Sequence, residues 1–166
     1  MDARPILVRV AQVLRKQGLE AVMIGNAAAA LHGAPVTTLD VDFFIPKTPT
    51  NVRKLKKVAG ALGATAFAPF YPVSGMFRLI RDVDGLQLDF MTRIEGVSSF
   101  NSVRAKAAVV DVDGEKLLIA DLADIIASKR AAGRPKDLAV LHELESTLEE
   151  QEAQRRGDPA GASERE

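Results

Sequence analysis

The segment GNAAAALHGAPVTTLDVDFF, residues 25–44, decides the fold. It opens with a glycine ahead of an alanine-rich run that predicts a short helix, which Gly33 and Pro35 would end. It closes with Asp40 and Asp42, one residue apart in an apolar run that predicts a strand. Because side chains alternate across a strand, the two aspartates share one face, with their Cα atoms roughly 7 Å apart.

Two neighbouring carboxylates repel each other and disfavour the charged form unless a cation or a shared proton lies between them. The sequence contains no cysteine and two histidines, so a metal ion bound here would be held mainly by oxygen. Mg²⁺ or Mn²⁺ is the ion that such ligands favour. The alternative is an edge strand whose aspartates simply face water.

The segments on either side predict one mixed α/β domain. The predicted elements are a helix ending near Gly18, a strand before Gly25, a helix over 52–62, hairpins over 76–94 and 107–120, and closing helices over 121–132 and 135–150. Strands joined by tight turns pair antiparallel, so we expect a mixed, mostly antiparallel sheet flanked by helices. Residues 1–150 would form this domain, and the charged residues 151–166 a disordered tail.

Composition excludes several classes of function. No stretch approaches the ~18 consecutive apolar residues of a membrane span, and the charged N-terminus does not resemble a signal peptide, so we expect a cytoplasmic protein. Basic and acidic residues both number 22, which removes any bulk attraction to nucleic acid and leaves room only for a local basic patch.

A third aspartate interrupts another apolar strand. Asp89 alternates with Leu88 and Phe90 in the second strand of the first predicted hairpin. Three carboxylates from two strands can hold two metal ions about 4 Å apart, the arrangement that stabilises both oxygens of a phosphoryl transfer. Asp89 could equally be an edge-strand charge that discourages aggregation.

Lys129 and Asp137 fall on the apolar stripes of the two closing helices. The stripes are formed by Leu122, Ile125 and Ile126 in the first helix and by Leu141, Leu144 and Leu148 in the second. A lysine directed inward needs an anionic partner or a route to solvent, so a structural ion pair with Asp137 is one interpretation. Arg130, Arg134 and Lys136 add positive charge suited to a triphosphate or an RNA backbone.

Gly25 and Asn26 stand where the first short helix begins. Free N–H groups and the helix dipole favour phosphate at such a terminus, and Asn26 could cap the helix. Close packing is the alternative explanation for the glycine. His32, beside Gly33, is typical of a histidine that satisfies carbonyls at a helix end rather than of a ligand.

Together these motifs resemble those of the polymerase-beta-like nucleotidyltransferase superfamily. Its signature is a hydrophobic residue, Gly, then Gly or Ser, followed by an acidic-x-acidic strand and a third carboxylate. The matching residues here are Ile24, Gly25, Asn26, then Asp40, Val41 and Asp42, and later Asp89. The segment ASKRAAGRPKDLAVL, residues 127–141, is similar to the closing part of the single-domain enzymes of the abortive-infection (AbiEii) toxin type. The matched pieces span residues 22–141.

The resemblance implies a Mg²⁺-dependent enzyme that moves a nucleotidyl group from a nucleoside triphosphate to an acceptor hydroxyl. It implies that Asp40 and Asp42 bind the metal ions, with Asp89 as a third ligand that helps to activate the acceptor. The nucleotide-binding residues that it implies are Gly25, Asn26, Thr38, Lys129 and Asp137. The acceptor could be the end of an RNA or tRNA, a protein or a small molecule, and toxin relatives suggest an antitoxin partner.

Two positions depart from the family pattern. Asn26 replaces the usual Gly or Ser, and Val36 replaces a basic residue that relatives often carry before the T-x-D stretch. Both changes leave the aspartates in place, so we expect an altered nucleotide site that is still active. The alternative is a binding module or toxin-antitoxin partner that keeps the fold without transferring nucleotides.

Overall fold

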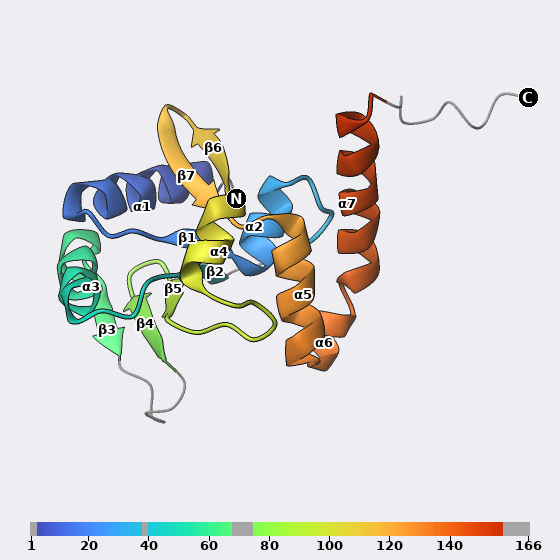
Figure 1. The fold of residues 1–166 in the computed structure, drawn as a ribbon. Helices are drawn as coiled ribbons and strands as arrows, with labels where there is room; N and C mark the ends of the chain where they lie inside the picture. The colour runs from blue at the N-terminus through green and yellow to red at the C-terminus, as the bar shows by residue number, and fades with distance from the viewer. Residues whose placement is uncertain (1–2, 38–39, 68–74, 158–166) are drawn as a thin grey trace, which may run out of the picture.

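The computed structural model describes residues 3–37, 40–67 and 75–157 as a mixed α/β fold (Figure 1). Its strands are β1 (Val22–Ile24), β2 (Asp40–Phe44), β3 (Thr65–Phe67), β4 (Met76–Arg81), β5 (Leu86–Met91), β6 (Ala108–Val112) and β7 (Glu115–Ile119). They form a seven-stranded sheet of order β3-β4-β5-β2-β1-β7-β6. The β2–β5 and β1–β7 pairs are parallel and the other pairs antiparallel, which confirms the predicted sheet type.

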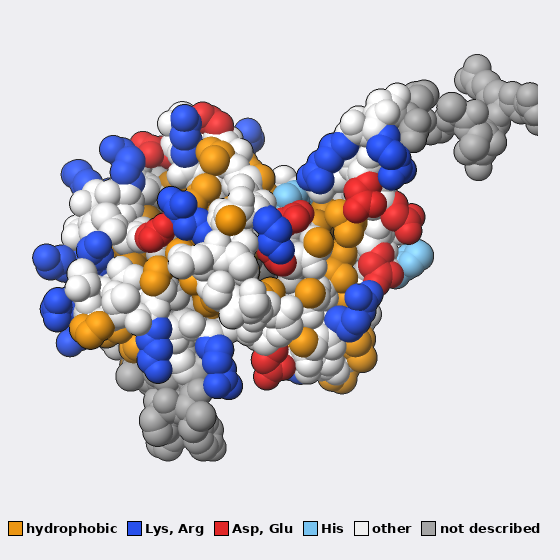
Figure 2. Space-filling view, in the orientation of Figure 1, with side chains coloured by type: hydrophobic (Ala, Val, Ile, Leu, Met, Phe, Trp, Pro, Cys, Tyr) orange, Lys and Arg blue, Asp and Glu red, His pale blue; other side chains and the backbone are white. Residues whose placement is uncertain are grey.

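The helices divide between the two sides of this sheet. They are α1 (Arg4–Gln17), α2 (Gly25–Leu31), α3 (Pro49–Leu62), α4 (Phe100–Lys106), α5 (Leu122–Ala132), α6 (Pro135–Leu138) and α7 (Leu141–Arg155). Helices α1 and α3 pack together on one side, and α2, α5, α6 and α7 lie toward the other (Figure 1). In the view of Figure 2, many Lys and Arg side chains gather over α1 and α3.

The centre of the sheet has one apolar face and one polar face. Phe43 of β2 and Phe90 of β5 are fully buried and stack with their ring centroids 5.1 Å apart. Strand alternation then directs Asp42 and Asp89, which are neighbours in the β2–β5 register, to the opposite face. The apolar face stabilises the sheet, and the polar face is free to carry a functional site.

The structure corrects the prediction of a single helix over 135–150. The chain forms the short α6 and then α7, with the break at Ala139 and Val140. Asp137 lies in α6, where its carboxylate pairs with Arg134, instead of sharing a stripe with the leucines of α7. This tertiary contact overrides the local helical pattern. The segments β3 and α4 were not predicted, because short elements carry little periodicity.

Helix α7 extends to Arg155, so residues 151–155, expected in the tail, are helical; 158–166 lie outside the described residues. His32 links this helix to the fold: its Nε2 lies 2.7 Å from the Ala120 carbonyl and its Nδ1 2.9 Å from Gln151 Nε2. A carbonyl accepts, so Nε2 donates and Nδ1 accepts from Gln151. His32 thus bonds a carbonyl, as predicted, but the carbonyl follows β7 and does not belong to the end of its own helix. No helix in the described part of the chain is long and apolar enough to cross a membrane.

Candidate active site

Asp42 lies against the turn between β1 and α2. The β1–β2 register places Asp42 beside Ile24, the last residue of β1. Gly25 follows with φ +70°, a left-handed conformation that side-chain-bearing residues rarely adopt. A Cβ at Gly25 would also lie 2.9 Å from Asp42 Oδ2. Both the backbone conformation and the position of the carboxylate therefore favour glycine here.

The surroundings of Asp42 disfavour its charged form. Burial, followed by the negative charges of Asp89 and Asp40, raises the pKa of Asp42 from 3.8 to about 6, against the opposing effect of Lys129 and Lys136. Burial is the largest cause of the raised pKa, and the two neighbouring carboxylates add to it more than the two lysines remove. A cation bound beside Asp42 would favour its charged form and lower this pKa.

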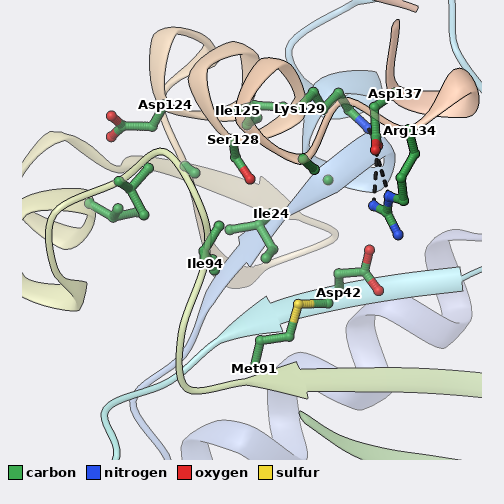
Figure 3. Close-up of a pocket in the computed structure, with 15 residues that line it drawn as sticks. Ile24, Asp42, Met91, Ile94, Asp124, Ile125, Ser128, Lys129, Arg134 and Asp137 are labelled. Atoms are coloured by element: carbon green, nitrogen blue, oxygen red, sulfur yellow. Dashed lines mark hydrogen bonds and ion pairs between the residues drawn. The ribbon is translucent and has the colours of Figure 1, made fainter. Parts of the chain in front are cut away.

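Cationic side chains form the wall that faces Asp42. Figure 3 shows Asp42 on β2 pointing toward Arg134 and Asp137, with Lys129 descending from α5. Arg134 donates two hydrogen bonds to Asp137, at 2.6 Å from Nε and 3.2 Å from Nη2. Lys129 Nζ lies 3.7 Å from Asp137 Oδ1, which confirms the expected pair. Asp137, only 2% exposed, thus anchors two cations at the mouth of the site.

The charge states of this wall follow from the same contacts. Burial alone would raise the pKa of Asp137, but the hydrogen bond and charge of Arg134 and the charge of Lys129 lower it. Burial lowers the pKa of Lys129, although Asp137 and Asp42 oppose that shift. Asp137 therefore stays ionised, and Lys129 is a cation that an added anionic ligand would stabilise.

Two adjoining cavities share Asp42, Lys129, Arg134 and Asp137. The first is polar and adds Asn26, Asp40 and Lys136 to the shared residues. Asn26 Oδ1 is buried and has no hydrogen-bond partner among the described residues, so this cavity contains an acceptor that a ligand could satisfy.

The second cavity is mostly apolar. Its side walls are built by Ile24, Met91, Ile94, Val97, Val103 and Ile125, with Ser128 as a polar exception. Asp124 points away from the other labelled residues in Figure 3, and its Oδ1 accepts a hydrogen bond from Lys106 at 2.7 Å. The site therefore offers a polar chamber for charged groups beside an apolar slot for a ring or an aliphatic body.

Asp89 occupies the neighbouring strand and is held by an arginine. Arg78 of β4 donates to Asp89 through Nε at 2.8 Å and through Nη2 at 3.1 Å. Sequence reasoning missed this partner. The signal was present in the predicted hairpin: Arg78 lies three residues before the end of β4 and Asp89 three residues after the start of β5.

Two of the strand aspartates could hold a divalent metal ion. Asp40 and Asp42 share one strand face and line one cavity with oxygen donors that suit Mg²⁺. Within the described ranges, no three His, Asp or Glu side chains are grouped so that they could hold a metal ion. The chemistry of Asp40 and Asp42 thus fits a cation, with two carboxylates rather than three.

The structure brings most of the predicted site residues together. Those that line the connected cavities are Gly25, Asn26, Asp40, Asp42, Lys129 and Asp137. The prediction that Asn26 caps α2 is wrong, because the N-cap is Ile24 and no side chain caps this helix. Thr38 lies outside the described residues.

A family match over nearly the whole chain gives the class of protein, that of the nucleotidyltransferases. The family described as "Nucleotidyl transferase of unknown function (DUF2204)" matches residues 3–156, and the chain belongs to it. Among curated proteins, no sequence matches this chain.

Solved structures share the fold at low sequence identity. ANT(2'')-Ia, in complex with adenylyl-2''-tobramycin, aligns with a TM-score of 0.62 and 14% identity over 93% of this chain and 95% of that one. The lincosamide adenylyltransferase LnuA, bound to lincomycin, gives 0.63 and 10% identity over 89% and 98%. An antigenic nucleotidyltransferase-like protein from Paracoccidioides brasiliensis gives 0.54 and 17% over 93% and 88%. At these identities the likeness establishes the fold alone.

Proposed function

We propose that the protein is a Mg²⁺-dependent nucleotidyltransferase that moves a nucleoside monophosphate from a nucleoside triphosphate to an acceptor hydroxyl. The observation that carries this proposal is that the Asp40 and Asp42 carboxylates and the cationic Lys129, Arg134 and Lys136 line one polar cavity. A triphosphate with its metal ion is the ligand class that satisfies both sides at once.

In this mechanism Asp40 and Asp42 would hold the metal ion, which would supply charge stabilisation to the transferring phosphoryl group. Lys129 and Arg134 bind the phosphate oxygens, and Asp137 orients both cations. The acceptor oxygen forms a bond to the α-phosphorus as the bond to the bridging oxygen breaks. Pyrophosphate leaves, and the acceptor hydroxyl proton passes to a base or to solvent.

The apolar cavity bears on the choice of acceptor. The neighbours named above were solved with an adenylylated aminoglycoside and with lincomycin. A polycationic acceptor requires acidic side chains that are not already paired. In this slot Asp137 is paired with Arg134 and Lys129, Asp124 turns away, and apart from Asp42 the walls are mainly aliphatic. We therefore favour a nucleobase or a neutral acceptor for the slot, over a polycationic one. An RNA or tRNA end and a protein hydroxyl remain within this proposal.

A toxin role with an antitoxin partner belongs to the same proposal, because the 127–141 segment resembles that of abortive-infection enzymes. Expression in a bacterial host tests it directly. The proposal expects growth arrest with the natural sequence and normal growth with the Asp40→Asn/Asp42→Asn variant. Equal growth of the two strains would contradict a toxin role and leave the enzyme assignment standing.

The enzyme assignment is tested by calorimetric titration of each nucleoside triphosphate, with and without Mg²⁺. We expect binding that requires Mg²⁺ and disappears in the Asp40→Asn/Asp42→Asn variant, which removes charge with little change of shape. Asp82→Asn, in the exposed turn after β4, is the matched control and should bind as the natural protein does. Binding unaffected by the double substitution would overturn the assigned site.

Binding without transfer would favour the second candidate, a non-catalytic module of the same fold. The observation behind this candidate is Asn26, which stands where the family usually has Gly or Ser. Incubation of the protein with radiolabelled triphosphate and a mixture of cellular RNA, protein and metabolites separates the two. Labelled product supports the enzyme, and bound but unchanged triphosphate supports the module.

A further inference from the structure

The Arg78–Asp89 pair lies at the edge of the proposed metal site. The Asp89 side chain is 7% exposed and that of Arg78 is 40% exposed. The carboxylate is therefore buried, whereas the guanidinium is partly accessible to solvent. Both Asp89 oxygens accept from Arg78, and Oδ2 also lies 3.3 Å from Gln87 Nε2. The oxygens that a metal ion would need are already engaged.

The sheet itself fixes this pairing. Arg78 is the cross-strand neighbour of Asp89 in the antiparallel β4–β5 pair, and Asp42 is its neighbour in the parallel β2–β5 pair. The three side chains therefore lie in one row across the sheet, on the same face. Separating a buried carboxylate from a bidentate guanidinium is strongly unfavourable, so the pair persists when a cation binds beside it.

We propose that Arg78 takes the place of a second metal ion: it holds Asp89 permanently, and the chain provides a site for one divalent cation, on Asp40 and Asp42. The identity of the reaction rests on the proposed function, whereas the number of bound ions does not. Arg78 is thus a positioning residue that acts through Asp89.

The test is a titration of the full chain with Mn²⁺ alone, followed by electron paramagnetic resonance of the free ion. We expect one Mn²⁺ per chain for the natural protein and two for Arg78→Gln, which frees the Asp89 oxygens. Arg78→Lys keeps the charge and should return the number to one. Arg81→Gln is the matched control, because Arg81 lies on the same strand as Arg78 and makes the same type of pair, with Asp84 of the following turn, away from the site.

Two ions bound by the natural protein would overturn this inference and leave the proposed function intact. One ion bound by Arg78→Gln would do the same, since Asp89 would then not be a ligand withheld by Arg78. No Mn²⁺ bound by any variant would overturn both the inference and the proposed metal site.

A second measurement does not depend on the fold of Arg78→Gln. The Arg78 Nε–H proton, donated to a buried carboxylate, should give a protected signal in the ¹H–¹⁵N spectrum of the natural protein. The inference expects that signal to remain protected at saturating Mg²⁺. Loss of protection on addition of Mg²⁺ would show that the ion displaces Arg78 and would overturn the inference.

Discussion

Gly25 and Asp42 are in such close contact that a Cβ added at position 25 would lie 2.9 Å from Asp42 Oδ2, so a side chain there would have to displace the carboxylate. The contact couples the turn before α2 to the orientation of the carboxylate proposed to bind the metal ion. Since φ at Gly25 is +70°, a substitution is also strained in the backbone. The turn and the carboxylate therefore form one unit.

The first prediction follows from this contact. Gly25→Ala should displace Asp42 and weaken Mg²⁺-dependent triphosphate binding by roughly tenfold or more, about 1.4 kcal/mol. Gly33→Ala is the matched control: Gly33 also has positive φ, +97°, but a Cβ there meets nothing within 4 Å. Both variants should lose stability through backbone strain, and calorimetry should show that only Gly25→Ala loses affinity. Equal losses of affinity would contradict the coupling.

The second prediction concerns stability and pH. Burial and the charges of Asp89 and Asp40 raise the pKa of Asp42 to about 6 from its usual 3.8. The folded protein thus binds this proton more tightly than the unfolded chain, so the contribution of Asp42 to stability is complete below pH 4 and is lost as pH rises through about 6. Asp42→Asn should therefore be more stable than the natural protein above pH 6, by on the order of 2 kcal/mol.

Thermal unfolding at a series of pH values measures this difference. The Tm of Asp42→Asn should exceed that of the natural protein at pH 7.5, and the difference should vanish near pH 4. Mg²⁺ should raise the Tm of the natural protein at pH 7.5 and leave Asp42→Asn unchanged. Parallel Tm curves for the two proteins across this pH range would show that the carboxyl is not perturbed.

The third prediction concerns Lys129, whose side chain is 11% exposed in the cavity wall. Lys129→Met keeps the aliphatic volume and removes the charge, so triphosphate affinity should fall by about 10- to 100-fold while the fold is retained. Burial lowers the pKa of Lys129, so this side chain loses its charge at a lower pH than an ordinary lysine. As pH rises, triphosphate binding by the natural protein should therefore weaken earlier than the pKa of an ordinary lysine would imply. Lys56→Met, at an exposed position of α3, is the control and should bind normally.

The fourth prediction separates the two cations that Asp137 anchors. Asp137→Ala leaves Lys129 buried without its carboxylate and should lower the free energy of unfolding by about 3 kcal/mol. Arg134→Ala should cost less, because the Arg134 side chain is 59% exposed. The double variant should lose less free energy of unfolding than the sum of the losses in the two single variants. Urea denaturation of the three variants measures the coupling, and strictly additive losses would contradict it.

The elements with strong periodicity were predictable from the sequence. The residue pattern of α1, α3 and the β4–β5 hairpin matches the structure because each buries one face of a regular repeat. The break between α6 and α7 was not predictable. It depends on the contacts of Asp137 with Arg134, just before α6, and with Lys129 of α5. Similarly, β3 and α4 are too short to show a repeat.

The candidate site divides in the same way. The sequence by itself determined that Asp40 and Asp42 share a strand face and that Gly25 precedes a helix, since both follow from local backbone geometry. Only the tertiary structure decided that Gly25 contacts Asp42. It also decided that Lys129 and Arg134 both pair with Asp137, and that Asp89 accepts hydrogen bonds from Arg78. Those relationships depend on which strands become neighbours and on how far each helix lies from the sheet. Both are set by how all the elements pack together to bury their apolar faces in one core.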